Sequence, residues 1–513
     1  MKIKFSLLIC YLGLLISVET ASCEVLKNKD PISAIDWLTE IHTSPRDKPQ
    51  KKQDYPKEFS ISAPKVALAK HKENRPPINL DQIYDGNIDV DSFRDLYKEV
   101  SFDLPPSILE LFYKTLIVRS TKYLKNDQYD QVLFLRLQKL FEFGAIPQII
   151  TLLDNIDLNN KFLFKIWLDT QILSYSDTEA CTKILGKNLS IFDYKTRIYC
   201  LEQSGNKKAA ILTLKAVESL NLLPLIDEIN LHKFLYSLGD KRYQISSGLA
   251  PVDPINYRIH KDIGNSFLKQ DLSLPYYFPE ISNNTNNLQK VEYVEDLVKS
   301  GAMSYDQLHA LYSSINLDSE QGQGSESYKR AALTQKLEYY KKNKYSKNLS
   351  NNFKELFEAL KEINIDNLAR KYYSLDLLNL VNDYPQSRKA LKLLISSCDM
   401  SSLKKIKNIS RLHPIYQNII FDIPLKKTYQ SIPVNIILNA IRANTPPNKP
   451  QSIIDKNNQA EAMLIAIKML NNRNIVEIEN VEMSIKYFNS VRFYDIAREV
   501  ALYTFANDII EWK

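Results

Sequence analysis

From about residue 79 to the C-terminus, apolar side chains recur at intervals of three and four residues, and this helical periodicity is the strongest constraint on the fold. No run in this region shows the convincing alternation of apolar and polar residues that a half-buried strand requires. Glycine supplies only 11 of the 513 residues, which disfavours folds that need many tight turns between strands. The sequence therefore predicts an all-α protein.

A glycine between two amphipathic helices is the repeated unit. At Gly205 one helix is expected to end, and Asn206 can cap the next; similar breaks occur at Gly144, Gly239 and Gly301. The spacing of these breaks is irregular, so we predict an irregular α-solenoid of helical hairpins, tetratricopeptide-like but without the full set of signature residues. The apolar stripes are Tyr194, Ile198 and Leu201 before Gly205, Ala210, Leu214 and Val217 after it, and Leu133, Leu137 and Leu140 before Gly144.

The N-terminus has the pattern of a secretory signal peptide, which we assign to residues 1–23. Lys2 and Lys4 precede an apolar stretch, and small residues follow it. The stretch is too short to span a membrane, and no later segment offers about 18 uninterrupted apolar residues. We therefore expect export, most simply to a bacterial periplasm. Cys23 follows Thr-Ala-Ser, which loosely matches the sequence before a lipidated cysteine, so a lipoprotein anchored through Cys23 is an alternative.

A short amphipathic helix is expected within residues 24–42, followed by a disordered linker rich in proline and lysine over 43–78. The apolar stripe of this helix can dock in a groove of another protein, or it can pack back onto its own chain. The sequence leaves both open. The stripe consists of Ala34, Trp37, Leu38 and Ile41.

Proline, aromatic and asparagine residues at non-helical spacing predict an irregular connection over 246–289, between an N-terminal helical lobe (79–245) and a C-terminal one (290–513). Three cysteines lie in the lobes. A disulfide between Cys181 and Cys200 is possible in an oxidising compartment, but buried free thiols are the favoured interpretation for all three, including Cys398.

Three segments resemble an uncharacterised family of exported helical proteins of alphaproteobacteria: PISAIDWLTE before the proline-rich linker, RIYCLEQSGNKKAAILTLKAVES, and VEDLVKSGAMSYDQLHALYS. The resemblance implies export by a bacterium and a helical body, and it brings no activity, ligand or functional residue. Some members of that family carry an antifreeze-type label, which this chain gives no physical reason to adopt, because it has no regular array of threonine-like side chains.

Signals for specific chemistry are weak throughout. The net charge of +7 is dispersed, which argues against nucleic-acid binding and leaves only weak electrostatic contact with a membrane. A calcium-like loop at 81–92 has Ile83 and Ser92 where ligands belong, and the six histidines form no zinc spacing. The GQGS segment at 322–325 and the glutamates Glu355, Glu358 and Glu362 are more simply a flexible turn and a solvated helix face. We therefore expect no cofactor, no metal and no catalytic residue.

The leading functional hypothesis is an exported, non-enzymatic scaffold or adaptor that binds other envelope proteins through a concave helical surface. The alternatives are a cell-wall glycan hydrolase or other envelope enzyme with a buried acid in a closed cleft, and a carrier of lipid or envelope polymer with an apolar or basic groove. An open groove lined by aromatic residues would favour the scaffold. Tyr339, Tyr340, Tyr372 and Tyr373 are candidates for such a groove, although packing between helices is the more common role of such residues. The oligomeric state is not predicted.

Overall fold

The computed structural model describes residues 80, 83–84, 89–118, 126–153, 160–185, 192–236, 253–283, 286–317, 324–343, 346–425, 429, 431–443, 458–471 and 477–506. All of these residues belong to one compact unit, within Ser44–Lys513. The expected signal peptide with Cys23, the helix within 24–42 and the linker at 43–78 lie outside the described residues.

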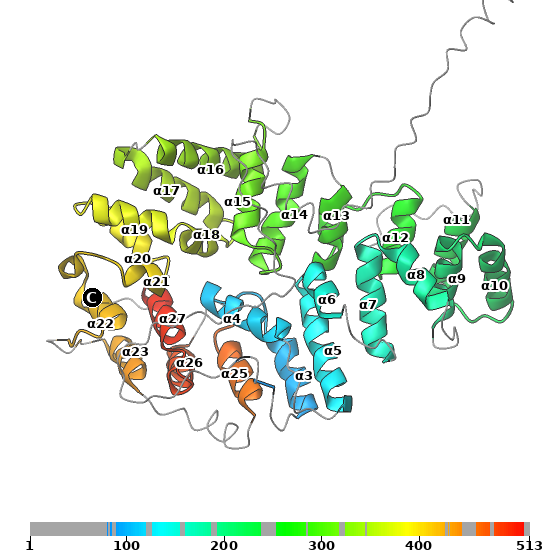
Figure 1. Ribbon diagram of the computed structural model, residues 1–513, viewed down its shortest axis with the longest axis horizontal. Helices are drawn as coiled ribbons and strands as arrows, with labels where there is room; N and C mark the ends of the chain where they lie inside the picture. Colours follow the sequence, from blue (N-terminus) through cyan, green and yellow to red (C-terminus); the bar gives the residue numbers. More distant parts are fainter. Residues whose placement is uncertain are drawn as a thin grey trace, which may run out of the picture. The chain divides into compact units, whose positions relative to one another are not determined.

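Helices make up the regular structure of the described residues, and no strand occurs among them (Figure 1). This confirms the all-α prediction. Among the described residues, 3₁₀ turns at Lys269–Asp271, Leu274–Tyr276 and Ile409–Arg411 lie between α-helices. The α-helices are α3 Val90–Glu99, α4 Pro106–Ile117, α5 Asn126–Glu142, α6 Ile146–Leu153, α7 Lys161–Leu173, α8 Asp177–Leu185, α9 Tyr194–Gln203, α10 Lys207–Ser219, α11 Leu225–Tyr236, α12 Pro254–Asp262, α13 Tyr277–Asn283, α14 Asn287–Lys299, α15 Tyr305–Ser314, α16 Glu326–Lys342, α17 Ser346–Lys361, α18 Asp366–Tyr372, α19 Ser374–Asp383, α20 Arg388–Ile395, α21 Met400–Leu403, α22 Pro414–Phe421, α23 Ile432–Arg442, α25 Gln459–Lys468, α26 Ile478–Ser490 and α27 Tyr494–Ala506.

Most helices pack against the next helix along the chain, as the helix–glycine–helix pattern predicts. Between α9 and α10, Gly205 has a φ of +79°, the left-handed conformation that glycine adopts without strain. Ile198 and Leu214 of the two stripes are fully buried. Asn206 stands at the N-cap position as expected, but its side chain makes no capping hydrogen bond. Gly144 and Gly301 likewise have positive φ between consecutive helices, whereas Gly239 lies outside the described residues.

The last helices of the chain also pack against the first ones: α25 contacts α3 and α4, and α27 contacts α4. The amide of Asn471 bridges the two segments, because its Nδ2 donates to the carbonyl of Glu99 at 2.6 Å and its Oδ1 accepts from the backbone N–H of Ser101 at 3.2 Å. Lys371 of α18 and Glu110 of α4, which are far apart in the sequence, form an ion pair at 2.8 Å. Stacking of sequence neighbours alone therefore does not account for the packing.

Residues 253–283 differ from the irregular structure expected within 246–289, because they include α12 and α13. Pro254 occupies the first turn of α12, where no backbone N–H is needed, and the Asp253 side chain caps the helix by accepting from the N–H of Asn256 at 3.0 Å. The proline therefore starts this helix instead of excluding one. α12 packs against α7 and α11, and α13 packs against α14, while the division into two lobes stays a prediction.

Cys181 of α8 and Cys200 of α9 form a disulfide, which corrects the preference for free thiols at these positions. The two helices pack directly, which brings the Cα atoms to 4.8 Å from each other, within the usual range for a disulfide. Cys398 is free and buried, as expected. The bond is consistent with an oxidising compartment outside the cytoplasm. Among the described residues, no helix has the length and apolar character needed to cross a membrane.

Candidate functional site

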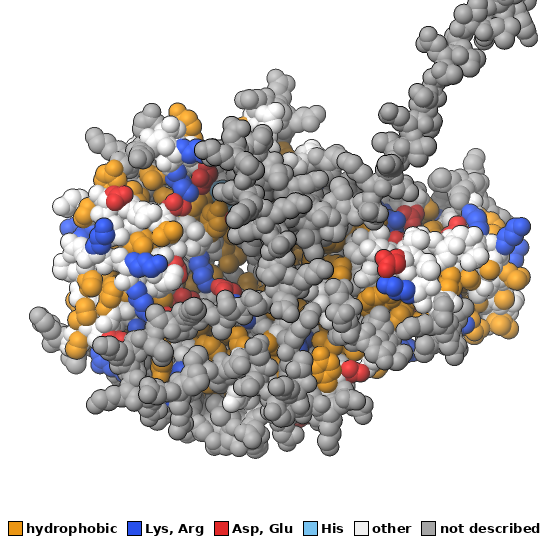
Figure 2. Space-filling view, in the orientation of Figure 1, with side chains coloured by type: hydrophobic (Ala, Val, Ile, Leu, Met, Phe, Trp, Pro, Cys, Tyr) orange, Lys and Arg blue, Asp and Glu red, His pale blue; other side chains and the backbone are white. Residues whose placement is uncertain are grey.

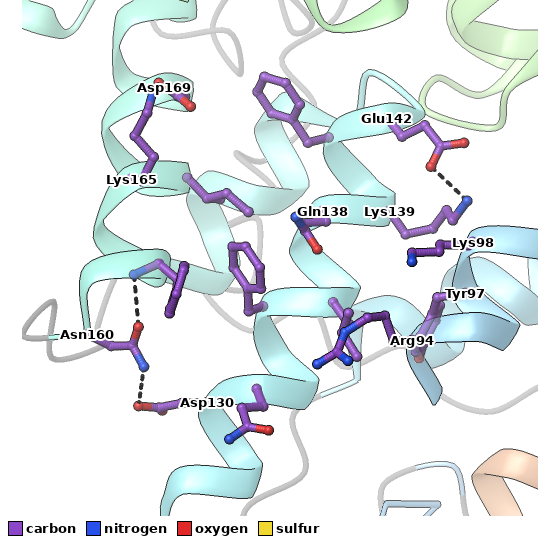
Figure 3. A pocket seen from close by; sticks show the side chains of 16 residues that line it. Arg94, Tyr97, Lys98, Asp130, Gln138, Lys139, Glu142, Asn160, Lys165 and Asp169 are labelled. Atoms are coloured by element: carbon purple, nitrogen blue, oxygen red, sulfur yellow. Dashed lines mark hydrogen bonds and ion pairs between the residues drawn. The ribbon is translucent and has the colours of Figure 1, made fainter. Parts of the chain in front are cut away.

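An open groove of about 960 Å³ lies over α5, between α3 and α7 (Figure 3). This volume is at the upper end of the range of roughly 300–1,000 Å³ found for ligand pockets. α5 packs against both neighbours, so it forms the floor and they form the walls. All of the lining residues except Asn160 come from these three helices, and a site built on helices holds its geometry better than a site built on loops.

The floor of the groove carries two phenylalanines on the side of α5 next to its leucine stripe. Phe134 and Phe141 are seven residues apart and share a helix face, and both are only partly buried. Between them stands Gln138, whose exposed side chain lies in the groove (Figure 3). The stripe of Leu133, Leu137 and Leu140 is buried, as predicted. α5 therefore has a second apolar stripe that the core does not use.

The wall formed by α7 also presents apolar and polar side chains to the groove. Phe162, Lys165, Ile166 and Asp169 follow helical spacing and line the groove together. Phe162 is 61% exposed, although it is a large aromatic residue, and its ring centroid lies 5.3 Å from that of Phe134. An aromatic side chain left this open in contact with a second aromatic ring is typical of a binding surface.

A short hydrogen-bond chain fixes the position of Phe162. Asn160 caps α7, because its Oδ1 accepts from the backbone N–H of Phe162 at 2.9 Å. The Nδ2 of Asn160 donates to Asp130 of α5 at 3.0 Å, and Figure 3 shows both bonds. The first turn of α7 is thereby attached to the floor helix.

Charged side chains surround the apolar floor. Arg94 and Lys98 of α3 are exposed and stand one helical turn apart on the same side of the opening. Lys139 of α5 is buried, and its Nζ donates to Glu142 at 2.7 Å and to the carbonyl of Val100 at 3.0 Å. Three cations therefore lie on the α3 side of the groove, of which Arg94 pairs with Asp91 and Lys139 with Glu142.

The α7 side carries an ion pair between Lys165 and Asp169 at 2.5 Å. Burial raises the pKa of Asp169 to about 6, with Asp253 and Asp193 adding to the effect and Lys165 opposing it. The charge on this wall consequently changes in the mildly acidic range. The groove offers apolar contact surface with polar groups at its margin, which suits binding of a peptide segment.

A second cavity, of about 10 Å³, lies among α4, α18, α27 and the segment before α21. Burial raises the pKa of Glu499 there to about 7, against the opposing effect of Lys371. Burial also raises the pKa of the Cys398 thiol, which keeps it in the unreactive protonated form. The cavity has room for about one water molecule, so this acid has no space for a substrate beside it.

The tyrosines considered from the sequence do not line the groove. Tyr373 is fully buried against Phe353 and Tyr305, whereas Tyr339 and Tyr372 are 59% and 38% exposed.

The structure also describes the glutamates of the expected solvated face and one residue of the calcium-like loop. Glu355 and Glu358 of α17 and Glu362 in the turn after it are exposed, as expected of a solvated face, and Ile83 of the calcium-like loop is buried. The docking stripe at Ala34, Trp37, Leu38 and Ile41 lies outside the described residues.

Sequence reasoning missed the groove, although part of its signal is visible. Phe134 and Phe141 follow a seven-residue spacing on the polar side of a helix whose leucines already provide a core face. A second apolar stripe of this kind indicates a binding face or a second packing partner. Nothing in the sequence indicates that α3 and α7 leave that face open.

A second group of exposed apolar side chains lies over α10, the turn that follows it and the start of α11, where Figure 2 shows hydrophobic surface. Leu212, Leu220 and Leu225 are 70%, 66% and 70% exposed. These leucines offer a comparison surface for experiments on the groove, because they are equally apolar and lie on a different part of the helical array.

No protein family, no curated protein and no solved structure matches the chain. The resemblance to exported alphaproteobacterial proteins therefore stays a prediction from the sequence.

Proposed function

We propose that the chain is an exported scaffold or adaptor, and that the groove between α3, α5 and α7 binds an amphipathic helix of another envelope protein. One observation carries this proposal: Phe134, Phe141 and Phe162, from two helices, leave apolar surface open to solvent inside one groove. A helix that lays its apolar stripe into a hydrophobic groove is a recurrent form of peptide recognition. The aromatic residues would supply most of the binding energy.

The charges around the groove restrict the partner. Lys98 favours a helix with a carboxylate on the side that faces α3. Arg94 and Lys165 already pair with Asp91 and Asp169, so they contribute less to selectivity. The array that presents this groove is, in our proposal, an irregular solenoid of helical hairpins whose last helices close against α3 and α4. Export is supported by the N-terminal pattern and by the Cys181–Cys200 disulfide.

An anionic lipid is the second candidate ligand, because the groove combines an apolar floor with a basic side. Its open form and the side-by-side phenylalanines favour a helix over an acyl chain. An enzymatic function has less support, since Glu499, a buried acid with a raised pKa, adjoins a cavity of about 10 Å³. Asp169, whose pKa is also raised, lines an open groove and not the closed cleft expected of such an enzyme.

Photo-crosslinking tests the proposal directly. A photoreactive residue at Gln138 reports on the groove, and one at Leu212 reports on the comparison surface. We expect a discrete protein adduct from position 138 in intact cells of the producing organism, and no such adduct from position 212. An adduct that contains only lipid would support the carrier, and the absence of any adduct from position 138 would overturn both.

A further inference from the structure

Three metal-ligating side chains meet between α10 and α11: Glu218, Glu228 and His232. One ligand atom from each lies within 4.8 Å of the other two. Glu228 and His232 are four residues apart on α11 and so share a helix face, while Glu218 comes from the last turn of α10. The cluster joins two helices and has none of the sequence spacings typical of zinc sites, which explains why the sequence did not predict it.

The turn between the helices is built to bring these residues together. Asn221, with a φ of +50°, ends α10 in the left-handed conformation. The N–H of Leu222 bonds to the carbonyl of Val217 at 3.1 Å, and the N–H of Asn221 bonds to that of Glu218 at 3.0 Å, which together form a Schellman motif. The chain reverses over this turn, and α11 packs back against α10.

Two of the ligand atoms in the cluster contact each other directly. Nε2 of His232 forms an ion pair with Oε1 of Glu218, which is itself shielded from solvent. The two carboxylates repel each other at this separation unless a cation lies between them. The ring of Tyr236 stacks on His232 at 5.4 Å and holds the imidazole in place.

We propose that Glu218, Glu228 and His232 bind a divalent transition-metal ion, with zinc as the best match. Zinc accepts imidazole nitrogen and carboxylate oxygen, and a set of three protein ligands leaves a fourth position for water. The side chains of Glu218 and His232 are 22% and 17% exposed, so the cluster lies near the surface, although Oε1 of Glu218 is itself shielded. The ion fastens α11 onto α10, independently of what occupies the groove.

Zinc titration of the full chain, with its disulfide intact and without an affinity tag, tests the site. After treatment with a chelator, isothermal titration calorimetry with zinc chloride should show one saturable site, and zinc should raise the unfolding temperature. Glu228→Gln and His232→Gln should each weaken binding at least about tenfold, since even changes beyond the direct ligands often cost that much. X-ray absorption at the zinc edge should show nitrogen and oxygen ligands without sulfur.

His309→Gln is the matched control, because His309 also pairs with one glutamate, Glu338, at 3.2 Å, but belongs to no such cluster of three among the described residues. This variant should bind zinc like the unmodified chain. Circular dichroism of each variant confirms that it is folded. The proposal is overturned if the folded chain takes up no zinc, or if the titration is the same for His232→Gln, Glu228→Gln and His309→Gln.

Discussion

The ring centroids of Phe134 on α5 and Phe162 on α7 lie 5.3 Å apart, with the ring planes inclined by 49°. Tilted aromatic pairs of this kind contribute about 0.5–1.5 kcal/mol. The pair joins a floor residue to a wall residue, so it stabilises the groove while leaving most of Phe162 exposed. The same contact therefore shapes the groove and supplies its binding surface.

Alanine substitutions at Gly144 and Gly205 form a matched pair, because both glycines have a φ of +79°. A Cβ at Gly205 meets nothing within 4 Å, so Gly205→Ala should cost only the backbone strain, about 1–2 kcal/mol. A Cβ at Gly144 would lie 2.9 Å from the carbonyl oxygen of Leu274 and 2.6 Å from Leu297. Gly144→Ala should cost clearly more. Urea unfolding of both variants measures the difference, and equal losses would show that the helices around Gly144 pack less closely than described.

Reduction of the Cys181–Cys200 disulfide should lower the free energy of unfolding. The bond closes a loop between residues 19 positions apart, for which the loss of constraint on the unfolded chain corresponds to about 3 kcal/mol. Urea unfolding with and without dithiothreitol measures it. The double variant Cys181→Ala/Cys200→Ala should not respond to the reductant, while Cys398→Ala should respond like the unmodified chain. Insensitivity of the unmodified chain would contradict the bond.

A buried ion pair joins α14 to α16. Arg330 binds Glu295 through two hydrogen bonds of 2.8 and 2.7 Å, and the hydroxyl of Tyr312 donates to the same carboxylate at 2.7 Å. Arg330→Met leaves a buried carboxylate without its cation and should cost about 3–5 kcal/mol. The double variant Arg330→Met/Glu295→Gln should cost less than the two single changes added together. Strict additivity in chemical denaturation would exclude the pairing.

The pH dependence of stability should reveal the raised pKa of Glu499. Burial raises the pKa of this carboxyl from 4.5 to about 7, so the folded chain holds a proton that the unfolded chain releases at lower pH. The resulting stabilisation is complete below about pH 4.5 and is lost as the pH rises to about 7. Glu499→Gln, which mimics the protonated form, should therefore gain up to about 3 kcal/mol relative to the unmodified chain between pH 4.5 and pH 8.

Glu110 should show the opposite pH dependence of stability in the same experiment. Its burial would raise the pKa, but Lys371 and Lys114 lower the pKa from 4.5 to about 2. The ionised carboxylate of Glu110 therefore stabilises the folded chain above pH 4.5, and this stabilisation is lost as the pH falls toward 2. Glu110→Gln should consequently destabilise the chain at neutral pH. If both variants respond to pH in the same direction, the assignment of Glu499 as a protonated group is wrong.

The sequence was sufficient to predict the helices and several of their ends. Gly144, Gly205 and Gly301 end helices as expected, because a left-handed residue after a helix is encoded locally. Pro254 was misinterpreted, since a proline that starts a helix and one that ends a helix look alike without their neighbours.

Features that depend on distant contacts could not be predicted in this way. The packing of α25 and α27 against α3 and α4 joins segments far apart in the sequence, and the Asn471–Glu99 hydrogen bond beside them spans 372 positions. The periodicity within each helix carries no information about its partner. The disulfide and the cluster at His232 could not be predicted for the same reason, because each forms only when two helices pack in one particular register. The groove could be predicted only in part. Its phenylalanines are visible in the sequence, but the open space above them depends on how the helices pack.

Phe162→Asp tests the binding role of the groove most directly. The residue is 61% exposed, so the change should affect folding little, while a carboxylate in the groove should weaken an apolar contact by about 2 kcal/mol, or about thirtyfold. The measurement is the yield of the protein adduct formed from a photoreactive residue at position 138, with Leu212→Asp as the matched control. We predict that Phe162→Asp removes the adduct and that Leu212→Asp leaves it intact. Equal yields from the two folded variants would contradict the proposal that this groove binds the partner.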